Sequence, residues 1–289
     1  MQKPKSADAS FALTTSPTPG SAKSDPILIA DKIVRQFGGL TAVNVDHLEI
    51  QRGSITALIG PNGAGKTTFF NLLTGYDSPN SGKWSFNGKD LNGIPPHKVA
   101  RLGMVRTFQL TKALYRLTVI ENMALGARGQ KGESVLRSVF PWIWRAQEAE
   151  IRTRATAILT NFKLIEKQDD FAAALSGGQR KLLEMARALM VEPEMIMLDE
   201  PMAGVNPALK QSLLEHIKEL RTEGKTVLFV EHDMDMVREI SDWVIVMAQG
   251  EVIAEGTPAS VMGNKDVIAA YLGAHHDEDL STSAEGAQA

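Results

Sequence analysis

The sequence of 289 residues contains no cysteine. Without thiols it has no disulfide, thiolate nucleophile or zinc–sulfur site, which fits a reducing compartment. It also lacks any apolar run that approaches the ~18 consecutive residues of a membrane span. Its positive and negative side chains nearly balance, at a formal net charge of −3, so bulk charge does not favour nucleic acid or anionic lipid as a partner. We therefore expect no membrane span and no nucleic-acid partner.

Both ends of the sequence differ in composition from its middle. Residues 1–26 are rich in Ser, Thr, Pro and Ala and have no continuous apolar run of the kind found in a signal peptide, so they predict a disordered tail. Residues 274–289 predict a second disordered tail with an acidic patch. The pair His275 and His276 within it has no third metal ligand in view. The folded part is expected to span residues 27–273.

The segment from Leu58 to Gly75, LIGPNGAGKTTFFNLLTG, places three glycines beside a lysine and two threonines. It fits the P-loop pattern of Gly, four residues and Gly-Lys-Ser/Thr. The preceding SITALIG has the apolar, β-branched character of a buried strand, and the following KTTFFNLLTG is typical of a helix that ends at a glycine. In such a loop, backbone N–H groups and the helix N-terminus converge on a phosphate.

A P-loop assigns chemistry to individual residues. Lys66 is expected to supply a positive charge to the outer phosphates, and the Thr67 hydroxyl is expected to ligate Mg²⁺. The alternative, a glycine-rich turn that matches by accident, lacks support because a strand and a helix flank the loop as the motif requires. The sequence therefore predicts a nucleoside triphosphate site formed by Gly60, Pro61, Asn62, Gly63, Ala64, Gly65, Lys66, Thr67 and Thr68.

Short apolar segments separated by turn signals precede the P-loop, from residue 27 to residue 59, and predict a strand-rich subdomain. A further hairpin is expected to turn at Asn87-Gly88. Residues of about 110–190 are predicted to be mainly helical, with a break at Pro141. Beyond them, strands and helices alternate, which predicts an α/β fold with a mostly parallel sheet around the P-loop strand.

An apolar strand, MIMLDEP, delivers Asp199 and Glu200 at its carboxyl end. A carboxylate in this place can hold the magnesium shell, and its neighbour can orient or deprotonate a water in line with the γ-phosphate. The alternative is that both are simple surface acids, but the P-loop upstream favours the catalytic interpretation.

The segment beginning LSGGQ at Leu175 places Ser176, Gly177 and Gly178 before a helix, so it can present a second anion site. By sterics alone these residues could equally form a plain helix cap. Only the first phosphate loop carries a lysine. We therefore expect the second loop to complete the site of another copy, in a symmetric head-to-tail dimer.

LSGGQ between a P-loop and MIMLDEP resembles the signature of ATP-binding cassette (ABC) proteins, from about Ile27 to Gly273. The resemblance implies a RecA-like parallel sheet core, an antiparallel β subdomain and a helical signature subdomain. It also implies that Ser176, Gly177, Gly178 and Gln179 contact ATP, and that Phe37 stacks on adenine, although the family more often has tyrosine and Phe37 could instead pack in the core. Gln109 resembles the glutamine that reaches Mg²⁺ and the attacking water, and His232 the histidine that contacts the γ-phosphate. Asn206 replaces the usual aspartate of the D-loop, AGVNP.

The resemblance implies an ATP-driven cycle. Two cassettes, identical or related, would sandwich ATP and Mg²⁺, and Glu200 would act as base or water-orienting group. Transmembrane permease subunits would dock near Gln109, and a separate substrate-binding protein would belong to the complex. This chain would itself lie at the cytoplasmic face of the membrane as a peripheral protein.

ARLGMVRTFQ, LTVIENMALGA and EPMAGVNP resemble the cassettes of branched-chain amino acid uptake, a group that includes urea and amide relatives. The ATPase of lipopolysaccharide export shares several of these features but usually lacks an insertion like residues 129–152. In that insertion, Phe140, Trp142 and Trp144 could contact the membrane or its subunits, or pack the helical subdomain. A chromosome, repair or translation ATPase of this family is disfavoured, since the sequence has one cassette and no long coiled coil.

Overall fold

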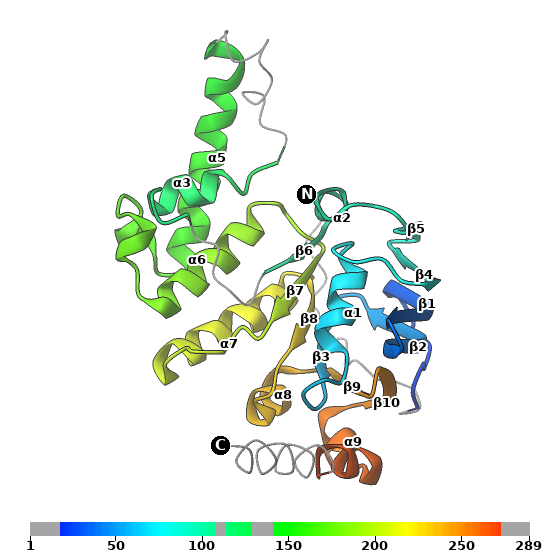
Figure 1. Ribbon diagram of the computed structural model, residues 1–289. Helices are drawn as coiled ribbons and strands as arrows, with labels where there is room; N and C mark the ends of the chain where they lie inside the picture. The colour runs from blue at the N-terminus through cyan, green and yellow to red at the C-terminus, as the bar shows by residue number, and fades with distance from the viewer. Residues whose placement is uncertain (1–17, 108–113, 129–140, 273–289) are drawn as a thin grey trace, which may run out of the picture.

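The computed structural model describes residues 18–107, 114–128 and 141–272. Within these ranges the chain forms two sheets and a set of helices around them (Figure 1). Among the described residues, no helix combines the length and the apolar composition that crossing a membrane requires.

The smaller sheet is antiparallel, in the order β2-β1-β4-β5. The hairpin of β1 and β2 has the longest pairing in this sheet, with ten paired positions from Pro26↔Gln51 to Phe37↔Leu40. The predicted turn at Asn87-Gly88 is confirmed, since both residues have positive φ angles of 50° and 70° and join β4 to β5. Its strands are β1 (Pro26–Phe37), β2 (Leu40–Gln51), β4 (Ser81–Phe86) and β5 (Lys89–Asp90).

The larger sheet has the order β10-β9-β3-β8-β7-β6 and carries the site. From β9 to β6 all neighbours are parallel, and only β10 runs antiparallel, so the predicted mostly parallel core is confirmed. All five residues of β3, β7 and β8 are buried, as expected when helices or a second sheet cover both faces. The strands are β3 (Ile55–Ile59), β6 (Met104–Arg106), β7 (Met195–Asp199), β8 (Thr226–Val230), β9 (Trp243–Ala248) and β10 (Glu251–Gly256).

Alternate residues of the larger sheet enter two different cores. Ile196, Leu198 and Phe229 face a core shared with α6, α7 and α8, whereas Met197 and Leu228 face one shared with α1 and the antiparallel sheet. Figure 1 shows these layers on either side of the larger sheet. The helices are α1 (Lys66–Leu73), α2 (Pro96–Leu102), α3 (Val119–Ala124), α5 (Pro141–Asn161), α6 (Gly177–Leu189), α7 (Pro207–Thr222), α8 (Met234–Ile240) and α9 (Pro258–Met262), with short 3-10 turns at Ile165–Lys167 and Ala172–Ala174 and helical residues 265–272.

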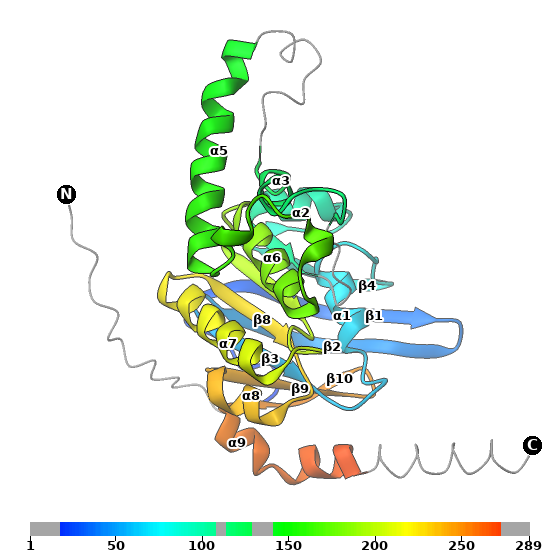
Figure 2. The ribbon, with the colours of Figure 1, turned by 90° about the vertical axis from the view of Figure 1, so that its left-hand side faces the viewer.

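The helices α3, α5 and α6 form the helical part that the sequence placed at about 110–190. Figure 2 shows α5 extending from this part away from both sheets. α5 begins at Pro141, where the fixed φ of proline suits the first helical position, so the predicted break is a helix start. Phe140 lies outside the described residues, and the side chains of Trp142 and Trp144 are not described, so the two interpretations of the insertion stay open.

The folded part begins before the predicted boundary at Ile27. Lys23 is only 8% exposed, its ammonium lies 3.0 Å from the Glu255 carboxylate, and its N–H donates to Glu49 at 2.6 Å. These contacts fasten residues 18–25 to β2 and β10. Residues 1–17 and 273–289, with His275 and His276, lie outside the described residues.

Candidate active site

The predicted phosphate loop joins β3 to α1 and turns through three glycines with positive φ. Gly60, Gly63 and Gly65 have φ angles of 151°, 75° and 95°. A Cβ at Gly60 would lie 2.0 Å from the Met247 carbonyl oxygen, and one at Gly65 would lie 2.3 Å from the Ala42 carbonyl oxygen. Because backbone atoms cannot move aside cheaply, two of the three glycines are required by packing as well as by φ.

Lys66, the first residue of α1, is only 6% exposed. Its ammonium donates to the carbonyl oxygens of Gly60 at 2.7 Å and Pro61 at 2.9 Å. Burial lowers the pKa of Lys66, while the nearby carboxylates of Glu200 and Asp199 oppose that shift. The loop thus places one buried positive charge, which the outer phosphates require, beside the two acids that the sequence assigns to Mg²⁺ and the attacking water.

The next two residues, Thr67 and Thr68, lie in the first turn of α1, and Thr67 is exposed. Among the residues that the structure describes, there is no cluster of three or more His, Asp or Glu side chains that could hold a metal ion. Mg²⁺ binds proteins through few side chains and keeps waters and phosphate oxygens in its shell. A threonine hydroxyl and the Asp199 carboxylate therefore fit this ion as a pair of ligands.

Asp199 ends β7 and is held by an arginine that sequence analysis missed. Arg106 at the end of β6 donates to Asp199 Oδ2 at 2.6 Å and to Asn71 Oδ1 at 2.6 Å. The paired side chains are 6% and 5% exposed. Adjacent parallel strands thus bring a buried cation to the predicted magnesium ligand.

Glu200 and His232 meet across the ends of two neighbouring strands. Glu200 follows β7 directly, His232 follows β8 by two residues, and Nε2 of the histidine lies 3.1 Å from Oε1 of the glutamate. Glu200 has a positive φ of 47°, which is uncommon for a residue with a side chain. The structure therefore places the predicted catalytic acid, the predicted histidine and Lys66 in one constellation.

Ser176 is the N-cap of α6 and forms a capping box: its hydroxyl accepts from Gln179 N, and its own N–H donates to Gln179 Oε1 at 3.0 Å. Gly177 is exposed, whereas a Cβ at Gly178 would lie 2.3 Å from Leu209 Cδ1 of α7. Ser176 therefore does form a helix cap, as the alternative interpretation held. Gly177 nevertheless stays accessible at the N-terminus of this 13-residue helix. Contact with ATP stays a prediction.

Asn206, which replaces the aspartate usual in the resembling family, is the N-cap of α7. Its side chain accepts from Leu209 N at 3.0 Å. Asn and Asp serve equally well at this position, so the replacement preserves the local role.

The roles of two further site residues, Phe37 and Gln109, stay predictions. Phe37 is 49% exposed at the end of β1, with the Arg35 guanidinium 4.4 Å from the ring centroid. The alternative that Phe37 packs in the core is therefore wrong, and its stacking on adenine stays a prediction. Gln109 lies outside the described residues.

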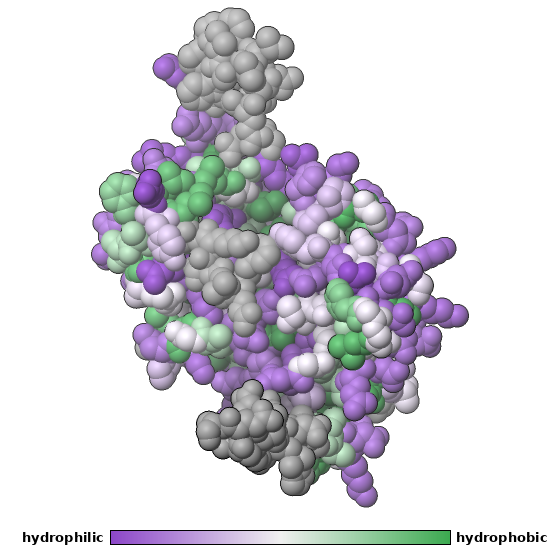
Figure 3. Space-filling model, viewed as in Figure 1, coloured by the Kyte–Doolittle hydropathy of each residue, from purple (hydrophilic) through white to green (hydrophobic). Residues whose placement is uncertain are grey.

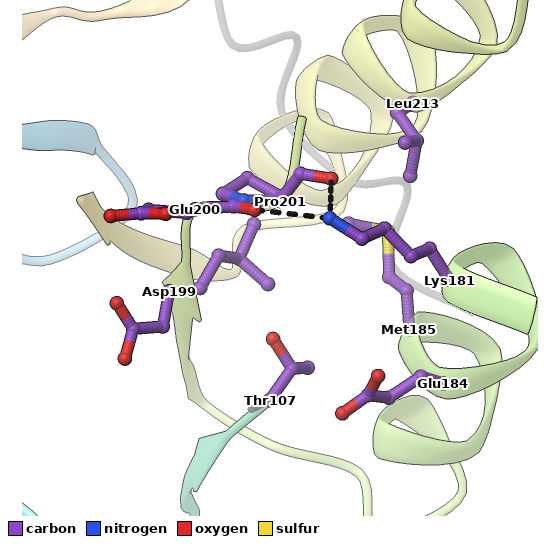
Figure 4. Close-up of a pocket in the computed structure, with 9 residues that line it drawn as sticks. Thr107, Lys181, Glu184, Met185, Asp199, Glu200, Pro201 and Leu213 are labelled. Atoms are coloured by element: carbon purple, nitrogen blue, oxygen red, sulfur yellow. Dashed lines mark hydrogen bonds between the residues drawn. The ribbon is translucent and has the colours of Figure 1, made fainter. Parts of the chain in front are cut away.

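Two more charged residues near the site were missed. Lys181 extends from α6 to the backbone that follows β7, as Figure 4 shows, and donates to the carbonyl oxygens of Glu200 and Pro201 at 3.2 Å each. Glu231, 5% exposed, accepts from Met202 N at 2.8 Å. Lys181 follows the LSGGQ segment by two residues and Glu231 directly precedes His232, but neither position reveals a backbone partner.

The sequence matches two known families. The profile of the family described as ABC transporter matches residues 43–203, and that of the family described as Branched-chain amino acid ATP-binding cassette transporter matches residues 251–277. These matches include the phosphate loop, the signature and the strand that ends at Asp199.

Known relatives and solved structures agree with this assignment. The chain is 44% identical over 252 residues to a probable branched-chain amino acid transport ATP-binding protein, LivG, of Archaeoglobus fulgidus, covering 87% of this chain and 97% of that protein. It is 41% identical over 252 residues to the high-affinity branched-chain amino acid transport ATP-binding protein BraF of Pseudomonas aeruginosa, covering 86% and 99%. A crystal structure of the ADP conformation of an ATP-binding cassette of an ABC transporter superposes with a TM-score of 0.74 at 38% identity, covering 86% and 99%. A dimeric cassette in a post-hydrolysis state bound to ADP and Pi gives a TM-score of 0.66 at 25% identity, covering 80% and 98%.

The predicted resemblance to ABC proteins is therefore confirmed, both by the sequence and by the nucleotide-binding fold. The chain belongs to the ABC transporter family, as a nucleotide-binding cassette ATPase of the branched-chain amino acid transport group.

Proposed function

We propose that this chain hydrolyses ATP to power the uptake of branched-chain amino acids through separate permease subunits. The observation that carries the proposal is the convergence of Lys66, Asp199, Glu200 and His232 beyond the carboxyl ends of β3, β7 and β8. The substrate class is supported by the names of the relatives and by the family match over residues 251–277.

The chemistry follows from this constellation. Glu200 accepts the proton of a water whose oxygen attacks the γ-phosphorus of ATP, while the bond from that phosphorus to the β–γ bridging oxygen breaks and ADP leaves. His232, 3.1 Å from Glu200, orients the acid and contacts the phosphate. Lys66 neutralises charge on the outer phosphates, Phe37 stacks on adenine, and Gln109 helps to place the water. When bound, Mg²⁺ held by Thr67 and Asp199 supplies positive charge to the phosphates.

The working unit is a dimer of cassettes in which each site is shared. The loop Ser176–Gln179 of one chain completes the site at the P-loop of the other, because this chain has only one lysine-bearing phosphate loop. Of the two forms, a dimer with a related cassette is favoured over a homodimer, because the group that this chain resembles often uses two different cassettes. The solved dimeric cassette bound to ADP and Pi supports this arrangement.

The permease subunits dock on the helical part, and a separate substrate-binding protein delivers the amino acid to them. Figure 3 shows hydrophobic surface gathered over α3. Four side chains around that helix are about half exposed, which suits a contact surface: Leu114 (48%), Tyr115 (51%), Leu125 (55%) and Phe171 (58%). The chain accordingly acts as a peripheral protein at the cytoplasmic face of the membrane.

The test is uptake of labelled leucine in cells that lack this chain and carry either it or Glu200→Gln. Glu215→Gln, an exposed glutamate on α7, is the matched control. Uptake that returns with the native chain and the control but not with Glu200→Gln supports the proposal. If the native chain hydrolyses ATP at membranes but does not restore leucine uptake, the substrate is wrong, and urea, amides and lipopolysaccharide export are tested next.

A further inference from the structure

A single ammonium group binds the backbone turn that carries Glu200. Lys181 Nζ donates to the carbonyl oxygens of Glu200 and Pro201 at 3.2 Å each, and also to that of Ala203. Figure 4 shows this side chain reaching across from α6 to the turn. Three converging carbonyl dipoles form a cation site, and they fix the path of the backbone from the end of β7 toward α7.

A buried carboxylate also binds the same turn. Glu231, 5% exposed, accepts from Met202 N at 2.8 Å and from His232 N at 3.2 Å. Burial is the main cause that raises the pKa of Glu231, and the charge of Glu200 raises it further. One carboxylate thus touches the turn after β7 and the residue that approaches the Glu200 side chain.

The two charges are complementary and act on opposite ends of peptide dipoles. A cation binds carbonyl oxygens, and an anion binds an amide one residue further along the same turn. Burial lowers the pKa of Lys181, while the charges of Glu231, Glu184 and Glu200 oppose that shift. Hydrogen bonds to charged groups are about twice as strong as neutral ones, so this pair constrains the turn more than a solvent-exposed lysine would.

The turn needs such support because Glu200 adopts a positive φ of 47°. A residue with a side chain holds this conformation only where its surroundings fix it. Its N–H donates to Val230 O at 3.0 Å, so this bond to β8 acts together with the Lys181 contact and the His232 side chain on the direction in which the carboxylate projects.

We propose that Lys181 and Glu231 are positioning residues that hold Glu200 in its catalytic orientation and tie it to the signature helix. This inference rests on the proposed role of Glu200. Lys181 lies two residues beyond Gln179 on α6, so a shift of the signature loop moves the ammonium that grips the Glu200 turn. In a dimer, that loop faces the partner's ATP. Lys181 therefore couples nucleotide bound at one site to the base of the other.

The test measures ATP hydrolysis by the full chain, with kcat, KM for ATP, the Hill coefficient for ATP and the melting temperature for each variant. Lys181→Met removes the donor, Lys181→Arg keeps a cation with several donors, and Glu231→Gln keeps an acceptor without charge. Lys218→Met is the matched control, because this lysine on α7 makes a surface ion pair with Glu239 at 2.8 Å.

Lys181→Met is expected to lower kcat at least tenfold with KM within twofold of the native value, because a misplaced base leaves nucleotide binding intact. Lys181→Arg is expected to recover most of kcat, Glu231→Gln to lower kcat, and Lys218→Met to behave as native. If the native chain is cooperative, Lys181→Met is expected to lower its Hill coefficient toward one.

Two results would overturn the inference. One is a Lys181→Met enzyme with kcat within twofold of native. The other is a loss of kcat that follows a loss of melting temperature and that Lys181→Arg does not restore, as a merely structural lysine would give. Glu200→Gln separates the proposals: if that variant hydrolyses ATP like the native chain, the proposed function itself fails, whatever the lysine variants do.

Discussion

Replacing Lys23 by methionine tests whether residues 18–25 belong to the folded protein. The Lys23–Glu255 pair is 3.0 Å long, and its side chains are 1% and 2% exposed. The ammonium also lies 4.3 Å from the Trp243 ring centroid, and Trp243 Nε1 donates to Glu255 at 2.8 Å. Lys23→Met preserves most of the apolar stem but leaves the Glu255 carboxylate buried without its cation.

The expected loss is large for a substitution so near the chain end. Removing one partner of a buried ion pair costs about 3–5 kcal/mol, because the remaining charge stays uncompensated. In a domain of this size each kcal/mol lowers the melting temperature by about 2–4 °C, so the expected drop is roughly 6–20 °C.

Thermal unfolding followed by circular dichroism measures the drop. Glu255→Gln in the Lys23→Met background removes the stranded charge while keeping an acceptor for Trp243, so the double variant is expected to be more stable than Lys23→Met alone. A drop below about 2 °C for Lys23→Met would show that the pair is not buried in solution, and would return residues 18–25 to the tail that composition predicts.

Three further predictions follow from packing, capping and burial. Gly178→Ala is expected to lower the melting temperature, since its Cβ would lie 2.3 Å from Leu209 Cδ1, whereas Gly177→Ala, whose Cβ would meet no atom closer than 4.0 Å, is expected to leave it unchanged; thermal scans that rank the two in the opposite order would contradict the packing argument. Asn206→Ala removes the cap of Leu209 N and is expected to cost about 1 kcal/mol in urea unfolding, while equal losses for Asn206→Asp would refute the capping role. Because burial raises the pKa of Glu231 above its ordinary value of 4.5, its ionisation opposes folding as pH rises through the raised pKa. Glu231→Gln is therefore expected to be more stable than the native chain at pH 8 and to lose that advantage at pH 4, and a difference that is constant with pH would speak against the shift.

Local signals predicted much of the secondary structure. Asn87 and Gly88 have φ angles of 50° and 70° and join β4 to β5, as their turn pattern predicted. A break in the helical pattern was predicted at Pro141, and in the structure this residue starts the helix α5. Strand order was not accessible, because β3 pairs with β8 and β9, which lie far away along the chain.

The site also contains residues that the sequence reveals and residues that only the fold brings together. The phosphate loop is contiguous, so its bends and its lysine are visible in sequence. Arg106, Lys181 and Glu231 were missed because their partners are an aspartate of another strand, three carbonyl oxygens and two amides, which only the folded backbone brings within reach. Lys23 was misjudged for a related reason: a tail-like composition says nothing about a buried glutamate on β10.

The position of β3 at the centre of the larger sheet has a consequence for synthesis of the protein. Its only sheet neighbours among the described strands are β8 and β9, with pairs such as Ala57↔Phe229 and Ala57↔Val244. A nascent chain that has passed the signature and Glu200 therefore carries the phosphate loop, the signature and the predicted base, though not His232, before either edge of its phosphate-loop strand is covered. Such long-range pairing is slow, and the open edges invite aggregation until it is complete. Premature termination anywhere before Thr226 is expected to give a substrate for chaperones and proteases rather than a weakened ATPase.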